Sequence, residues 1–215
     1  EEEQTVVRFD NLEATAPSGA SSSSASASSN KGAQNTPESS PTSTTAAINT
    51  NNNDGTLYED DFSDKDSGWE IGDYEEGWVN YTNGTYEVGA YSSGYPMWGI
   101  ANRNFSDIAV TVEATQYDAP SNSNNSFGII LREQGNADGY HFLISGDGYY
   151  AIYLLEDGSL MPLVDFTASD VINQGNTTNT ITAVADGNDL AFIVNGETLA
   201  TTTDDTFSSG DIALT

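Results

Sequence analysis

From residue 56 onward, apolar and polar residues alternate in short runs that are separated by turn dipeptides. In the run Ile108–Ala114 every second residue is apolar, and Leu190–Val194 repeats that pattern. Dipeptides such as Asn83-Gly84 and Asn195-Gly196 favour the positive φ angles of tight hairpins. Because no stretch keeps a 3.6-residue period, helices are expected to be nearly absent.

The apolar runs predict about twelve short strands, a number typical of a two-sheet antiparallel sandwich. The runs are Leu57–Phe62, Gly84–Tyr91, Met97–Asn102, Ile108–Tyr117, Ser126–Glu133, Tyr140–Ser145, Tyr149–Glu156, Leu160–Phe166, Thr178–Ala185, Leu190–Val194, Thr198–Thr203 and Ile212–Leu214.

One further strand is expected at the N-terminus, apart from the others. Residues 1–14 contain the alternating segment Thr5–Leu12, of which one face carries Val7 and Phe9. Residues 15–55 are rich in Ser, Thr, Ala and Asn, a composition that cannot build a core and predicts a linker. The Ser and Thr tracts of this linker suit O-glycosylation. The chain therefore divides into a strand (1–14), a linker (15–55) and a sandwich domain (56–215).

Several motifs of the sandwich form a familiar series. They are Leu57–Asp64 followed by Ser67-Gly68-Trp69, then Gly128–Arg132 and Tyr140–Ser145, and finally Asp189–Gly196 and Ser209–Ile212. With these motifs, residues 57–215 resemble the concanavalin A-like jelly-roll domains, the laminin-G and glucanase-like group of bacterial and archaeal surface proteins. The motifs are mostly turns and core positions, so they specify the fold better than a function.

The resemblance implies that a closing strand of the form Val-x-Phe-Asp-Asn-hydrophobic follows Ile212–Leu214. In this sequence that pattern stands at the N-terminus, where Val7, Phe9 and Leu12 are its apolar positions. The chain is then one period of a tandem array, a subunit that donates its strand to a neighbour's sandwich, or a permuted domain whose own strand folds back. A linker reach of about 30–40 Å permits the last arrangement. We favour the first two, in which the strand closes another repeat or subunit.

The charge is extreme, with 33 acidic residues against 5 basic ones and a net charge of −28. Such a surface repels nucleic acid and anionic membranes. No run of about eighteen apolar residues is present, so membrane insertion is not expected. The charge suits an extracellular or cell-surface protein, because like charge limits unwanted pairing of strand edges.

The sequence does not predict an enzyme. Retaining glycosidases need two carboxyl groups about 5–5.5 Å apart, and in the glucanases that these motifs resemble both come from alternate positions of one strand. Here Glu113 stands alone in its strand and Glu133 sits beside a turn. His141 is the single histidine, it lies inside a strand, and the chain has no cysteine. We therefore expect His141 to be structural.

Calcium is the one cofactor that the sequence suggests. Asp60, Asp61, Asp64 and Asp66 offer hard oxygen ligands. An EF-hand that begins at Asp64 is excluded, because Trp69 occupies the position that requires glycine. The alternative is that these carboxylates belong to an acidic strand end and its turn.

Aromatic residues form the most serious site hypothesis. Sugars bind to exposed Trp and Tyr with polar groups nearby, and the candidates are Trp78, Tyr81, Tyr91 and Trp98. The competing explanation is that about half of them fill the core, as Trp69 is expected to do. Five asparagines lie in Asn-x-Ser/Thr sequons and are candidates for N-glycosylation. They are Asn80, Asn83, Asn104, Asn124 and Asn176.

Two functions are consistent with these observations. The leading one is a non-catalytic structural or adhesive subunit whose partners are other copies of itself, joined into a filament or array through the N-terminal strand. The alternative is a carbohydrate-binding module of a secreted or surface protein, with glycans as partners.

Overall fold

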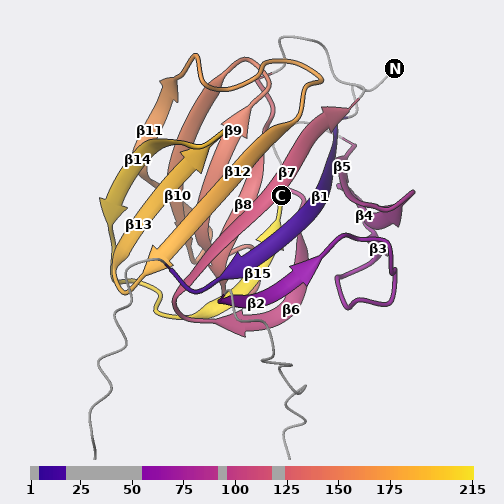
Figure 1. Ribbon diagram of the computed structural model, residues 1–215, viewed down its shortest axis with the longest axis horizontal. Coiled ribbons are helices and arrows are strands. Elements are labelled where there is room, and N and C mark those ends of the chain that lie inside the picture. Colours follow the sequence, from indigo (N-terminus) through magenta and orange to yellow (C-terminus); the bar gives the residue numbers. More distant parts are fainter. Residues whose placement is uncertain (1–4, 18–54, 92–95, 118–123) are drawn as a thin grey trace, which may run out of the picture.

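The computed structural model describes residues 5–17, 55–91, 96–117 and 124–215. Within these ranges it has fifteen strands and no helix, and the strands form two antiparallel sheets that face each other (Figure 1). No helix long and apolar enough to cross a membrane occurs in the described part of the chain. The expected all-β, two-sheet jelly-roll sandwich is therefore confirmed.

The larger sheet has nine strands in the order β14-β13-β12-β7-β1-β5-β4-β3, and β2 also pairs with β1. Its strands are β1 (Thr5–Thr15), β2 (Thr56–Asp60), β3 (Gly72–Asp73), β4 (Gly77–Thr82), β5 (Thr85–Ala90), β7 (Ile108–Tyr117), β12 (Asn179–Asp186), β13 (Asp189–Val194) and β14 (Glu197–Thr203).

The smaller sheet has six strands in the order β11-β10-β9-β8-β15-β6. Its strands are β6 (Gly99–Phe105), β8 (Ser126–Glu133), β9 (Gly139–Ser145), β10 (Tyr149–Glu156), β11 (Ser159–Ala168) and β15 (Gly210–Leu214). Every strand that the sequence predicts is present, and β3 and β4 are additional.

The core lies between the two sheets and follows the alternation of the sequence. Its fully buried side chains come from both sheets, because each strand turns every second residue inward. Examples are Phe9, Val110, Phe142 and Phe192. Trp69 is also buried, and it packs edge-on against Phe62 at 5.5 Å between ring centroids, as a structural role requires.

The N-terminal strand occupies the middle of the larger sheet of its own chain (Figure 1). One edge of β1 pairs with β7, while the other pairs first with β5 and then with β2. Val7, Phe9 and Leu12 are buried in the shared core. The structure thus has the third arrangement of those considered, in which the chain's own strand folds back, rather than either of the two that we favoured.

A β-bulge in β1 allows Leu12 and Ala14 to face the core together with Val7 and Phe9. The register with β7 shifts between Asp10 and Glu13, and Asn11 has a φ of 51°. Because an extra residue reverses which face the following side chains occupy, the buried positions change from 7 and 9 to 12 and 14. The strand therefore buries Leu12 and Ala14 as well as the pair that simple alternation predicts.

The two ends of the linker meet at one point. The Ala16 amide donates a hydrogen bond of 3.2 Å to the Gly55 carbonyl, just beyond the paired ends of β1 and β2. Residues 18–54, which include the Ser and Thr tracts suited to O-glycosylation, lie outside the described residues. Because these two ends lie side by side, the linker has no distance to bridge when β1 folds back onto its own sheet.

Candidate functional site

The candidate site lies at the hairpin β4–β5, on the outer face of the larger sheet. Asn83 (φ 53°) and Gly84 (φ 82°) form its tight turn. In β4 the side chains of Val79 and Tyr81 lean toward the core, so Trp78 and Asn80 point outward. Trp78 is half-buried in this position, although it lies outside the core.

Two glycines let aromatic rings lie flat on the sheet. A Cβ atom at Gly89, which is paired with Trp78, would come within 2.2 Å of the indole ring. A Cβ atom at Gly72 would come equally close to the hydroxyl of Tyr74. Each ring therefore rests directly on backbone, which gives this part of the sheet an aromatic covering.

A buried carboxylate fixes the Trp78 indole. Glu87 of β5 accepts a hydrogen bond of 3.0 Å from Trp78 Nε1 and another of 3.0 Å from Arg8 Nε of β1. The Arg8 guanidinium in turn lies 3.9 Å from the ring centroid of Tyr117 in β7. Three strands that are far apart in sequence thus hold one side chain in place, and charge-assisted hydrogen bonds of this kind are strong.

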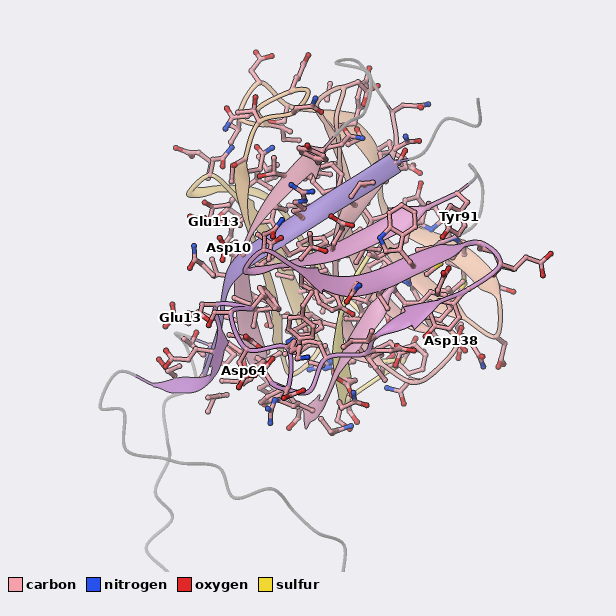
Figure 2. All side chains as sticks on the ribbon, turned by 90° about the vertical axis from the view of Figure 1, so that its right-hand side faces the viewer. Asp10, Glu13, Asp64, Tyr91, Glu113 and Asp138 are labelled. Atoms are coloured by element: carbon pink, nitrogen blue, oxygen red, sulfur yellow. The ribbon has the colours of Figure 1, made fainter. Side chains whose placement is uncertain are left out.

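Trp78 and Tyr91 form an aromatic pair beside an open cavity. Their ring centroids are 5.0 Å apart at an interplanar angle of 40°, and Tyr91 is labelled in Figure 2. The Tyr91 hydroxyl donates a 3.0 Å hydrogen bond to Asp73, which raises the pKa of the phenol and keeps it a neutral donor. The cavity has a volume of about 440 Å³ and is lined by Ile71, Gly72, Asp73, Trp78, Val79, Asn80 and Tyr91.

The four aromatic candidates do not form one site. Trp78 and Tyr91 lie together, whereas Tyr81 packs against the core and its hydroxyl accepts the amide of Trp69 at 3.0 Å. Trp98 packs on a separate apolar cluster around Ile130, on the other sheet. Sequence reasoning missed Arg8 and Glu87, because nothing in the sequence relates two residues 79 positions apart until the strand register is known.

The acidic residues suggested for calcium serve the turn after β2. Asp60 accepts from the Phe62 amide at 2.8 Å and from Ser67 Oγ at 2.5 Å. Asp61 and Asp64 accept from the amides two residues ahead, at 3.0 and 2.9 Å. In the described part of the chain no three or more His, Asp or Glu side chains gather to hold a metal ion. Calcium binding by Asp60, Asp61, Asp64 and Asp66 stays a prediction without support from this geometry.

The five sequon asparagines are all exposed, so each amide is accessible. Asn80 lines the cavity and Asn83 lies in the β4–β5 turn. The other three are Asn104, Asn124 and Asn176. Their glycosylation stays a prediction.

His141 lies on the outer face of the smaller sheet and is buried. Its Nε2 lies 2.7 Å from the Ala137 carbonyl, so this nitrogen carries the proton and donates. Burial lowers the pKa of the imidazole. A neutral, hydrogen-bonded and inaccessible ring has a structural role.

No family model matches the sequence, and no curated protein matches it either. Among solved structures, the carbohydrate-binding module CBM66 from Bacillus subtilis matches with a TM-score of 0.53 at 16% identity, over 69% of this chain and 86% of that module. This chain has the sandwich fold of that module. A proposed glycosyl hydrolase from Parabacteroides distasonis ATCC 8503 matches with a TM-score of 0.46 at 12% identity, over 68% and 81% of the two chains. At these identities the likeness concerns the fold, so the site is argued from this chain's own residues.

Proposed function

We propose that this chain is a carbohydrate-binding domain of a secreted or cell-surface protein, and that its site is the cavity beside Trp78 and Tyr91. The observation that carries the proposal is this fixed aromatic pair with polar groups converging on one opening. Asp73 and Asn80 line the same cavity.

The chemistry of the cavity suits a sugar. Pyranose rings present C–H faces that pack on aromatic rings, while their hydroxyls exchange hydrogen bonds with amide and carboxylate groups. A volume of about 440 Å³ is within the usual range for a small-ligand site. Because Glu87 and Gly89 hold the indole before any ligand arrives, little ordering entropy remains to be lost on binding.

The likeness to CBM66 supports this choice over an adhesive subunit. That protein is named as a carbohydrate-binding module, and it shares the sandwich that presents the site here. The β1 strand pairs with β7 and β5 of its own chain, which supports a binding site that needs no strand from a second copy.

The experiment is a calorimetric titration with a panel of soluble oligosaccharides, followed by the same titration on Trp78→Ala. We expect binding to weaken about thirtyfold or more, as for a buried Trp anchor that contributes about 2 kcal/mol. Tyr149→Ala is the matched control, because Tyr149 is an exposed aromatic residue on the other sheet. Equal affinity for Trp78→Ala and the parent would refute this site, and absence of binding to any glycan would refute the function.

Strand exchange between copies is the second candidate function. It is favoured by one feature, namely that β1 is central in its sheet while residues 16–55 separate it along the chain from the next strand, β2. A second copy's β1 would make the same contacts, and the balance then depends on concentration. Exchange of β1 between copies would link them into the donated-strand array, with other copies of the chain as partners.

Because the chain has no cysteine, exchange can be trapped selectively. Asp10 of β1 lies directly opposite Glu113 of β7, a separation that a disulfide can bridge. Asp10→Cys chains mixed with mass-labelled Glu113→Cys chains should form mixed disulfide dimers if strands exchange. The double variant is the control that cross-links within one chain. Exchange is rejected if the double variant cross-links completely within one chain while the mixed single variants form no dimer at millimolar protein.

A further inference from the structure

The surface around the cavity has an excess of carboxylates. Asp73 lines the cavity, and Glu75 and Glu76 are exposed in the turn that follows β3. Glu70 accepts a hydrogen bond of 2.5 Å from the hydroxyl of Tyr74, whose ring lies over the cavity residue Gly72. Negative charge thus gathers on the β3 side of the aromatic pair.

The nearby cation does not neutralise this surface. Arg8 forms its ion pair with Glu87 and packs its guanidinium on Tyr117, on the side of Trp78 away from β3. The other described cations are Arg132, Arg103 and Lys65. Arg132 is buried among backbone carbonyls, Arg103 packs on Tyr58, and Lys65 is exposed in the segment between β2 and β3, outside the cavity lining. Asp73 forms no salt bridge among the described residues, so its charge faces the opening without a counter-ion.

We propose that the glycan bound here carries free amino groups, as oligomers of glucosamine do. This rests on the proposed function and specifies its ligand class. A protonated amine is attracted to the face of Trp78 or Tyr91 through the ring quadrupole and to the Asp73 carboxylate through charge. An acetylated amine or a neutral sugar can stack in the same place but loses both attractions, and a uronic acid is repelled.

The test compares three pentasaccharides near pH 6, where an amine of ordinary pKa is protonated. They are the pentamers of glucosamine, N-acetylglucosamine and glucose. We expect the glucosamine pentamer to bind at least about tenfold more tightly than the other two at low salt, with the ratio falling as ionic strength rises. Equal binding of all three, lost in Trp78→Ala, would overturn the amino-sugar inference while leaving the proposed function intact. Absence of binding to all three would overturn the amino-sugar inference by itself, because the function is judged by the wider panel.

The variant Asp73→Asn tests whether binding of the amino sugar depends on the charge at this site or on the acidic surface of the chain as a whole. The asparagine carbonyl can still accept the Tyr91 hydrogen bond, so the variant removes charge alone. Since Asp73 also offers hydrogen bonds to sugar hydroxyls, some loss is expected for every pentamer. We expect the loss for the glucosamine pentamer to be about threefold to tenfold larger than the loss for the neutral pentamers. Asp165→Asn removes one charge from an exposed position on β11 of the other sheet and should change neither.

Pentalysine is the second control, because it carries amines without a sugar ring. The inference predicts that it binds much more weakly than the glucosamine pentamer, because it has no sugar ring to stack on the aromatic pair. Pentalysine as tight as the glucosamine pentamer, or equal losses in Asp73→Asn and Asp165→Asn, would show that the acidic surface binds any polycation, and the inference would be wrong.

Discussion

Replacing Gln116 with methionine should stabilise the protein. Gln116 is fully buried and points into the core from β7, directly opposite Val7 of β1. Both its Nε2 and its Oε1 lack a hydrogen-bond partner among the described residues. Methionine has nearly the same shape and flexibility but carries no group that needs a partner.

The magnitude follows from the cost of an unpaired buried polar group, about 1–3 kcal/mol each. The amide carries two such groups, but an ordered water can offset part of the cost. We therefore expect a gain of about 1–3 kcal/mol in the free energy of unfolding. For a chain of this size that gain raises the melting temperature by about 3–10 °C.

Differential scanning calorimetry measures the shift, and a urea titration checks that the m-value is unchanged. Gln134→Met is the matched control, because Gln134 Nε2 donates to the carbonyls of Arg132 and Ser209 at 2.8 and 2.6 Å. This variant should lose stability. A loss of stability in Gln116→Met as well would refute the reasoning, since it would mean that the Gln116 amide has a partner in solution.

Three further predictions concern charge. Asp10 and Glu113 lie opposite each other on β1 and β7 (Figure 2), so Glu113→Lys should stabilise by about 0.5 kcal/mol at low salt, and equal urea midpoints for both proteins would contradict this. Burial raises the pKa of Glu133, and Asp211 adds to the rise. Since the folded state then binds the proton more tightly, stability should fall as pH rises from the ordinary carboxyl pKa through the raised one, and Glu133→Gln should lack this part of the slope in urea titrations. Glu87→Ala should weaken glycan binding severalfold by releasing the Trp78 indole, and calorimetry showing unchanged affinity would exclude the positioning role.

The fold was largely predictable because a strand that buries one face shows apolar residues at every second position of the sequence. The bounds expected for β7, β8 and β10 are those observed. The strand β4 was missed, although the turn Asn83-Gly84 requires a strand on each side. The bulge at Asn11 was also missed, since one extra residue is visible only against the partner strand.

Half of the aromatic site was predictable. Trp78 and Tyr91 were named, but they were grouped with Tyr81, which lies on the opposite face of the same strand. Placing β4 correctly would have separated the two by alternation alone. The Arg8–Glu87 pair depends on β1 entering between β7 and β5, a long-range choice that local patterning does not contain.

Energetics explain why β1 folds back in this chain. Closing a loop of roughly 40 residues costs about 3 kcal/mol plus a constant. Burial of Val7, Phe9 and Leu12 contributes about 1.5–3 kcal/mol for each side chain. Burial of this apolar face thus exceeds the cost of closing the loop, which favours the chain's own sheet over that of a second copy at low protein concentration.

The most direct measurement of the central claim uses the three tryptophans as reporters. Their indole N–H groups are resolved in a nitrogen–proton correlation spectrum, and they sit at the cavity (Trp78), in the core (Trp69) and on the other sheet (Trp98). Titration with a binding glycan should shift the Trp78 signal and leave the other two in place. A shift of Trp98 with Trp78 unmoved would contradict the account, because the glycan would then bind the opposite face of the sandwich.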